Sequence, residues 1–283
     1  MKSVRVRRFV LCVFFTGFID ASAQTGVVVR PQLRTDQILH VSTALEFSVN
    51  VNVEVGGQPG TAKIVNKALL AFKQTNRGAD DKNRMEAQLT IERIESEEMA
   101  GGKTSANAAQ LAALAGQTVS AFFDRDGKLV DVEVPKEANQ ASALIRQLVA
   151  SSFSALNFLP AEPMTVGQTL TVPVSIPLRL PTNTSSGSYE TKTATTLRGV
   201  DSAAGHRIAH LDQRTESSGA ADQPKVAGTG TIDVNVDRGY IAASTIEWNV
   251  TGTYPAANQP AGARAGEMTA TIKATTTANE ETK

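Results

Sequence analysis

The sequence has few of the residues on which specific chemistry most often depends. Its 283 residues include one cysteine, three histidines, one tryptophan and three tyrosines. The cysteine is Cys12, within the N-terminal apolar segment, so the rest of the chain has no cysteine for a disulfide, a thiol nucleophile or a zinc site. The scarcity of aromatic rings argues against a stacking platform for sugars or single-stranded nucleic acid.

The chain also lacks an excess of charge. Its 28 Lys and Arg residues balance 28 Asp and Glu residues, which disfavours a binder of nucleic-acid backbones. Hydrophobic residues make up 41% of the chain and charged residues 20%, a composition that can bury a sizeable core. We therefore expect a folded protein with no nucleic-acid partner.

The N-terminus has the features of a secretory signal peptide. Basic residues at positions 2–8 precede an apolar run over 9–19, and Ala21-Ser22-Ala23 provides the small residues of a cleavage site. The apolar run is too short for a membrane anchor, which needs about 20 residues. We expect a signal peptide over residues 1–23, export to the periplasm or the exterior, and no transmembrane segment in the mature chain.

Alternation of apolar and polar residues predicts that most of the mature chain is β-strand. The clearest strand is 45–55, where apolar residues occupy the odd positions from Leu45 to Val55. The alternation over 85–92 slips before Ile94, which predicts a β-bulge. Further strands are predicted at 62–73, 169–175, 189–200, 206–215, 225–236, 240–254 and 267–275.

Two segments depart from this pattern. Pro135 can open a helix, and apolar residues then recur every three or four positions, which predicts an amphipathic helix over 135–156. The apolar stripe of this helix needs a cover, which the face of a sheet would provide. The alanine-rich residues 106–115, closed by Gly116, predict a second, short helix.

Two hairpins share an order of apolar strand, acidic-glycine turn and apolar strand, at 121–132 and at 232–241. This similarity leaves open whether the β-rich domain, 24–275, is a single unit or two related halves that meet near residue 160. The polar residues 276–283 are expected to form a frayed tail.

These patterns predict a mainly β protein: a curved antiparallel sheet or half-barrel of about ten strands, with the amphipathic helix on its concave side. A two-sheet sandwich is the alternative. The space between helix and sheet is the predicted site for an apolar ligand. The residues expected to line it are Phe47, Val49, Val51, Leu144, Leu148 and Phe153.

A family resemblance supports this expectation. Residues 158–170, Phe-Leu-Pro-Ala-Glu-Pro-Met-Thr-Val-Gly-Gln-Thr-Leu, follow the predicted helix and lead into the strand-rich second half. This segment resembles the middle segment of a family of uncharacterised secreted bacterial β-rich proteins. The order of elements is also similar to that of the half-barrel lipoprotein carriers and lipid-binding lipoproteins of bacterial envelopes. The resemblance implies an apolar ligand site between helix and sheet.

Candidate catalytic and metal-binding patterns are better explained by structure. His206 and His210 have the spacing of a zinc-protease helix, but Arg207 follows where a glutamate is needed, and four residues of strand span about 13 Å. Residues 124–127, Asp-Arg-Asp-Gly, begin like a calcium loop but lack its later ligands, so they predict a hairpin turn. We therefore expect no catalytic residue, no metal site and no cofactor.

Three functions follow, in order of preference. The first is an exported, non-enzymatic protein that binds an apolar or lipid-like molecule between sheet and helix. The second is a structural component of the cell envelope that contacts another envelope protein. The third is a hydrolase, for which the sequence offers neither a Gly-x-Ser-x-Gly elbow nor a phosphate-binding glycine loop.

Overall fold

The structure is a computed structural model of the whole chain. It describes residues 26–55, 57–80, 82–100, 103–106, 111–125, 127–136, 141–178, 187–217, 224–254 and 263–281. The predicted signal peptide, 1–23, lies outside the described residues. No helix among the described residues is long and apolar enough to cross a membrane.

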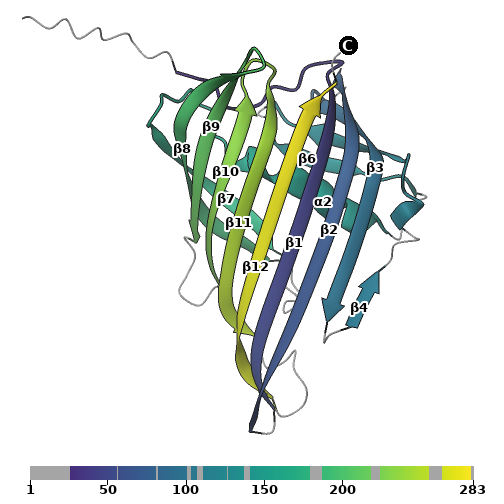
Figure 1. The fold of residues 1–283 in the computed structure, drawn as a ribbon, viewed down its shortest axis with the longest axis vertical. Helices are drawn as coiled ribbons and strands as arrows, with labels where there is room; N and C mark the ends of the chain where they lie inside the picture. Colours follow the sequence, from purple (N-terminus) through teal and green to yellow (C-terminus); the bar gives the residue numbers. More distant parts are fainter. Residues whose placement is uncertain are drawn as a thin grey trace, which may run out of the picture.

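The described residues form one large antiparallel sheet (Figure 1). Its strands are β1 (Ile38–Val55), β2 (Gln58–Ala79), β3 (Met85–Ala100), β4 (Lys103–Ala106), β5 (Thr118–Phe123), β6 (Leu129–Glu133), β7 (Thr169–Leu178), β8 (Gly187–Ala203), β9 (His206–Ser217), β10 (Lys225–Asn235), β11 (Tyr240–Tyr254) and β12 (Ala263–Glu280). Eleven of the twelve strands follow the order β6-β5-β3-β2-β1-β12-β11-β10-β9-β8-β7, and the twelfth, β4, pairs with β3. The first strand thus pairs with the last in the middle of the sheet.

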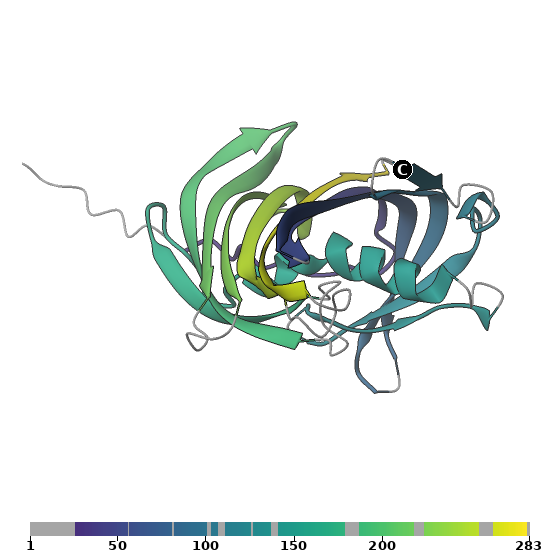
Figure 2. The same cartoon turned by 90° about the horizontal axis from the view of Figure 1, so that it is seen from below.

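The sheet curves around one α-helix, α2 (Ser142–Ser152), which is followed by the 3-10 helix η2 (Ser154–Phe158). Figure 2 shows α2 inside this curve, across the inner face of the long strands. The predicted curved sheet with a helix on its concave side is therefore confirmed. The alternative of a two-sheet sandwich is wrong, because every strand belongs to the same hydrogen-bonded sheet.

The predicted bulge in β3 is confirmed. Ala71 pairs with Arg93 but the next residue, Phe72, pairs with Ile91, so Glu92 is the extra residue. The bulge keeps Ile91 and Ile94 both buried although they are three residues apart. The predicted hairpin over 121–132 is also present as the paired strands β5 and β6.

The helices differ from their predicted extents. The main helix begins at Ser142 rather than at Pro135, and residues 137–140 lie outside the described residues. Of the short helix predicted over 106–115, Ala106 instead ends strand β4, whereas Leu111 and Ala112 are helical as predicted and turns follow over 113–116; residues 107–110 lie outside the described residues.

The predicted frayed tail is wrong over most of its length. β12 continues to Glu280, which pairs with Leu39 of β1. Within this extension Thr276 and Ala278 are buried on the inner face. The alternation of small inward residues with polar outward residues therefore continues a strand, although its composition is that of a polar terminus.

Two hydrophobic cores lie on the inner face of the sheet. The helical core, under α2, includes Leu39, Val41, Leu70, Phe72, Leu89, Ile91, Ile145, Leu148 and Phe153. The η2 core, under η2 and the segments around it, includes Val29, Val49, Val51, Phe158, Leu159, Met164, Leu197, Leu211, Trp248 and Met268. One continuous sheet carries both cores, and the division into two related halves stays a prediction.

The end of β12 is held by an ion pair that makes stability depend on pH. Arg238 Nε donates a hydrogen bond of 2.6 Å to Glu280 Oε2, and this contact holds the pKa of Glu280 below its ordinary value of 4.5. Because the pKa is lower in the folded state, the stabilisation is complete above pH 4.5 and is lost as the pH falls through the folded-state pKa.

We therefore expect Glu280→Gln to lower the free energy of unfolding at pH 7 but to have little effect at the lowest pH at which the protein still folds. Urea unfolding at a series of pH values measures this difference. Glu162→Gln, at an exposed position outside the strands, is the control. An equal loss at every pH would show that the ion pair does not cause the pH dependence.

Candidate ligand site on the concave face

The structure places the six predicted lining residues on the inner side of the sheet or on α2 and its C-terminal end, but not in a single site. Val49 and Val51 of β1 belong to the η2 core, whereas Leu148 and Phe153 belong to the helical core. Phe47 and Leu144 are only partly buried. Whether any of the six contacts a ligand stays a prediction.

Side chains of the protein itself surround the helical members of this set. The Phe153 ring lies 4.9 Å from the ring of Phe123 in an edge-on arrangement and 6.0 Å from the ring of Phe72, centroid to centroid. Leu148 has no exposed surface. The contact between α2 and the sheet is therefore close-packed at these positions, as protein cores generally are.

Between the two cores, a strip of apolar residues on the inner face is only half-buried. We call Leu45 and Phe47 of β1, with Ile64 and Ala68 of β2, the inner strip. Register pairs Leu45 with Ala68 and places Phe47 between Leu45 and Val49 on the same face. Leu45 packs against both cores. The strip is thus an apolar part of the concave face that the described helices leave partly open to solvent.

A row of residues runs across the sheet from this strip to the η2 core. Phe47 pairs with Ile272 of β12, Ile272 with Trp248 of β11, and Trp248 with Gly228 of β10. The indole of Trp248 lies over Gly228, where a Cβ atom would be only 2.5 Å from Cδ1 of the ring. Phe158 of η2 covers the indole, with the two ring centroids 5.8 Å apart. Glycine at position 228 therefore makes room for the indole.

Three polar atoms along the inner face are buried without a hydrogen-bond partner among the described residues. They are Trp248 Nε1, Gln213 Nε2 and Asn66 Oδ1. Trp248 is 6% exposed and Gln213 5%. Buried polar groups in native proteins are nearly always hydrogen-bonded, so each of these atoms needs a partner from beyond the described residues, such as a water molecule or a ligand.

The hydroxyl groups nearby on the inner face are paired. Thr191 Oγ1 donates to the carbonyl of Val174, and Thr195 Oγ1 donates to the carbonyl of Phe158. Thr193 and Thr215 share a hydrogen bond of 2.9 Å between their hydroxyls. Since only one proton lies between these two oxygens, the pair retains a second hydroxyl proton that can be donated elsewhere.

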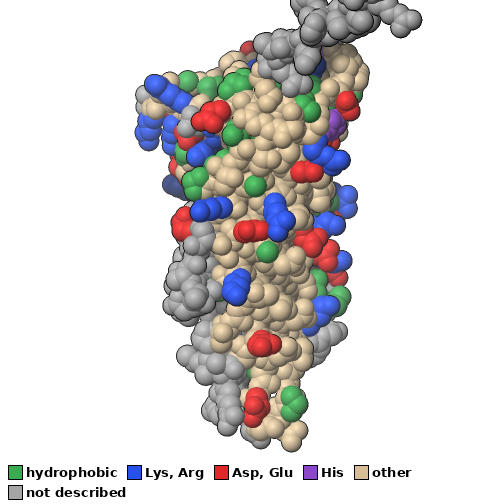
Figure 3. Space-filling model, turned by 90° about the vertical axis from the view of Figure 1, so that its left-hand side faces the viewer, with side chains coloured by type: hydrophobic (Ala, Val, Ile, Leu, Met, Phe, Trp, Pro, Cys, Tyr) green, Lys and Arg blue, Asp and Glu red, His purple; other side chains and the backbone are tan. Residues whose placement is uncertain are grey.

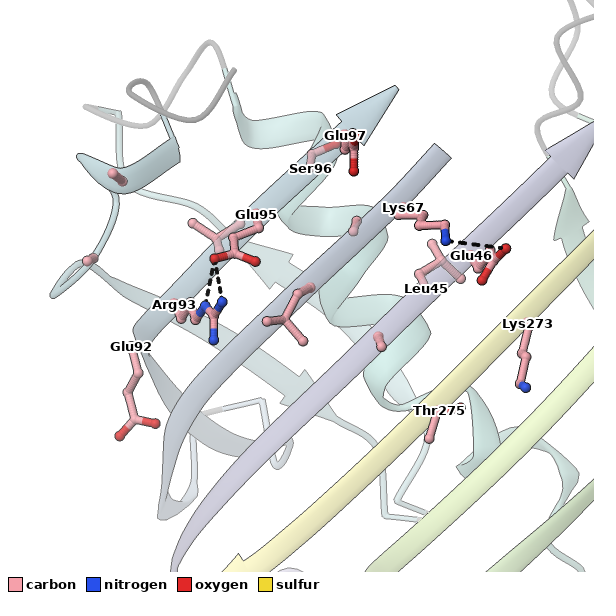
Figure 4. Close-up of a pocket in the computed structure, with 16 residues that line it drawn as sticks. Leu45, Glu46, Lys67, Glu92, Arg93, Glu95, Ser96, Glu97, Lys273 and Thr275 are labelled. Carbon is pink, nitrogen blue, oxygen red and sulfur yellow. Dashed lines mark hydrogen bonds and ion pairs between the residues drawn. The ribbon is translucent and has the colours of Figure 1, made fainter. Parts of the chain in front are cut away.

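The outer face of the sheet carries a hollow of a different character. It has a volume of about 720 Å³ and is lined by residues of β1, β2, β3 and β12, which include Leu45 and Ala68 of the inner strip as well as charged residues (Figure 4). Lys67 Nζ lies 3.9 Å from Glu46 Oε1, and Arg93 Nη2 lies 2.7 Å from Glu95 Oε1. In the face shown in Figure 3, charged side chains are spread over the surface and the hydrophobic ones stand singly or in small groups. The outer face is therefore less suited to an apolar ligand than the inner strip.

Two of the three histidines, His40 and His210, are engaged with carboxylates at the surface. His40 Nδ1 is hydrogen-bonded to Glu92 Oε1 at 3.0 Å, and His210 Nδ1 to Asp233 Oδ1 at 2.8 Å. His206 begins β9 and His210 lies within it, so the predicted strand between them is confirmed. Within the described ranges, no group of three or more His, Cys, Asp or Glu side chains is arranged to hold a metal ion.

The predicted turn at 124–127 joins β5 to β6. The amide of Lys128 donates to Asp124 Oδ1, and Gly127 has a φ of 74°, which glycine adopts easily. Asp126 lies outside the described residues.

Trp248 and Gln213 are not among the residues predicted to line the site. A usable signal was present in Gly228 and Gly230, which interrupt the apolar alternation of β10. Glycine within a strand often marks the close approach of another group, here the indole of Trp248.

No family model matches the chain, and no curated protein matches it. One similar structure is lipovitellin, solved in a study of its lipid–protein interactions, with 10% identity and a TM-score of 0.49 over 88% of this chain and 25% of that chain. Another is an outer membrane channel from Pseudomonas putida F1, with 7% identity and a TM-score of 0.23 over 88% of this chain and 98% of that chain. This chain spans about a quarter of the lipovitellin chain, and at these TM-scores neither likeness bears on function.

Proposed function

We propose that the chain is an exported, non-enzymatic protein that binds an apolar or lipid-like molecule on its concave face, at the inner strip. The observation that carries the proposal is the partial exposure of Leu45, Phe47, Ile64 and Ala68 between two buried cores. Concave apolar surface with a few polar groups at its border is the usual form of a small-molecule site.

The energetics of burial support this site. Each square ångström of apolar surface removed from water contributes about 25 cal/mol, and an alkyl chain on the strip would bury its own surface together with that of Leu45 and Phe47. The neighbouring inner-face residues Val49 and Ala270 are fully or almost fully buried, so close-packed core residues border the strip on this side.

The proposed absence of catalysis is supported by where the titratable groups lie. His40 and His210 are hydrogen-bonded to carboxylates on the outer face. The inner strip consists of apolar side chains. Its cross-strand polar neighbours are Asn66, which pairs with Phe47, and Ser96, which pairs with Ala68, and Glu98 pairs with Asn66 one strand further on. Among the described residues, the rows of the strip therefore hold one carboxylate and no histidine. Export is supported by the signal-peptide features of residues 1–23.

Phe47→Asp tests the site directly. A carboxylate in the middle of the strip opposes burial of an alkyl chain, so the affinity for a fluorescent fatty acid, 11-(dansylamino)undecanoic acid, should fall at least tenfold. Ser48→Asp is the matched control, because the next residue of β1 faces the opposite side of the sheet. Fluorescence titration of the three proteins gives the affinities.

Two results would contradict the proposal. One is no saturable binding by the wild-type protein, and the other is equal loss of affinity in both variants. If Phe47→Asp does not fold, Phe47→Ala provides the milder change, with an expected loss of a few-fold.

A structural role in the envelope is a second candidate, and the outer face favours it. Register aligns Glu97, Lys67, Glu46, Lys273 and Glu247 in one row across five strands, with charges that alternate in sign. Such a row could pair with a complementary row on a partner protein. Pull-down from an envelope extract that recovers a stoichiometric partner, lost on Lys273→Glu, would favour this role.

A further inference from the structure

We propose that the buried donors of Trp248 and Gln213 bind the carbonyl oxygen of a neutral acyl ester whose alkyl chain lies on the inner strip. This inference rests on the proposed function and specifies its ligand. It depends on the positions of the two donors, on the absence of a cation beside them and on their distance from the strip.

The two donors lie on the inner face on either side of β10. The indole nitrogen of Trp248 sits over β10, because a Cβ atom at Gly228 would be 3.2 Å from Nε1. Gly228 pairs with Thr215 of β9, and Gln213 is the next inward residue of the same strand. Gly228 and Gln213 are therefore diagonal neighbours with backbones about 7–8 Å apart, so the Gln213 side chain can reach toward the indole that lies over Gly228.

The unpaired polar atoms around Trp248 and Gln213 are hydrogen-bond donors rather than acceptors. Trp248 Nε1 and Gln213 Nε2 both lack a partner among the described residues. The Thr193–Thr215 pair retains one hydroxyl proton beside them. The indole nitrogen can only donate, so only an oxygen or another acceptor can satisfy it. The missing partner is therefore an acceptor.

The surroundings favour an uncharged acceptor. In the two rows that contain Trp248 and Gln213, the inward positions from β7 to β12 carry no Lys, Arg or His among the described residues. A buried carboxylate or phosphate without a cation is strongly disfavoured. An ester or amide carbonyl accepts two hydrogen bonds and carries no net charge.

The spacing suits an acyl chain. Phe47 and Trp248 lie in the same row, separated by β12, so their backbones are about 10 Å apart at the usual strand spacing. A carbonyl at Trp248 thus places the first carbons of its chain over Ile272 and the following carbons on the strip. Phe158 covers the indole and must move to admit the ester.

The test compares two ligands that differ in one carbonyl group. 1-Monododecanoylglycerol is an ester, and 1-O-dodecylglycerol is the ether with the same chain length and the same hydroxyl groups. Their affinities are measured below their micelle concentrations by displacement of 11-(dansylamino)undecanoic acid. The wild-type protein should bind the ester about tenfold more tightly than the ether, since two otherwise unpaired donors gain a partner.

Trp248→Phe keeps an aromatic ring and removes the N–H group. It should reduce the preference for the ester over the ether to about threefold or less, and it should leave the affinity for the ether unchanged. Gln213→Leu should act in the same direction and is the second variant if Trp248→Phe does not fold. Asn249→Ala, at the next residue of β11 on the outer face, is the control and should keep the full preference. Dodecanoate should bind more weakly than the ester at neutral pH.

Each other outcome overturns the inference. Equal affinities of the wild-type protein for ester and ether would mean that the buried donors are satisfied by water. A preference that survives in both variants would place the carbonyl elsewhere. Tighter binding of dodecanoate would contradict a neutral ligand. If neither glycerol lipid nor the fluorescent fatty acid binds, the proposed function fails as well. If ester and ether bind equally well, only this inference fails.

Discussion

Leu148→Ala should lower the free energy of unfolding by about 3–5 kcal/mol, the upper part of the range for a large core residue replaced by alanine. Leu148 is completely buried on the face of α2 that meets the sheet, next to Ile145 and Val149. The loss combines the transfer energy of the removed carbons with the cavity that remains, since the close-packed surroundings cannot collapse fully. Urea unfolding followed by circular dichroism measures the change.

Leu144→Ala is the matched control on the same helix. Leu144 is only half-buried, so its truncation should cost less than half as much. Equal effects of the two substitutions would show that α2 does not pack on the sheet through the face that carries Leu148. The position of the helix on the concave side would then be wrong.

Gly228→Ala should cost about 1–3 kcal/mol, although it adds only one methyl group. The new Cβ atom would be 2.5 Å from Cδ1 of Trp248 and 2.8 Å from the carbonyl oxygen of Glu247, so both the indole and the backbone of β11 must shift. Gly199→Ala is the control, since a Cβ atom there meets nothing within 4 Å. Its effect should stay within about 0.5 kcal/mol.

A double-mutant cycle separates the two contacts at Gly228. In a Trp248→Ala background the ring is gone, and Gly228→Ala should cost less than in the wild type. An unchanged cost would mean that the indole does not lie over Gly228. The placement of the indole donor in the proposed carbonyl site would then lose its support.

Much of the fold was predictable because alternation of apolar and polar residues is a local property. The predicted strands all fall within observed strands apart from one residue, Val236, at the end of β10, and the slip before Ile94 marked a real bulge. The pairing of β1 with β12 was not predictable, since partner choice between distant segments leaves no local pattern. That pairing also explains why residues 276–280 form a strand despite their polar composition.

The candidate site was predictable in part. The pattern placed Phe47, Val49 and Val51 on one face, which the structure confirms. The pattern could not show which residues along β1 the helix covers, because this depends on the register of strands far apart in the sequence. As a result, the predicted lining residues of α2 and of β1 belong to different cores. The buried donor of Trp248 depends equally on long-range register.

The central claim is that the inner strip binds an alkyl chain, and the single tryptophan reports on it. We would titrate the protein with a monoacylglycerol that carries bromine atoms in its acyl chain and follow the fluorescence of Trp248, because bromine quenches an indole only at short range. The account predicts saturable quenching with one lipid per chain, which is lost in Phe47→Asp and kept in Ser48→Asp. Binding that leaves Trp248 unquenched, or no binding at all, would contradict it.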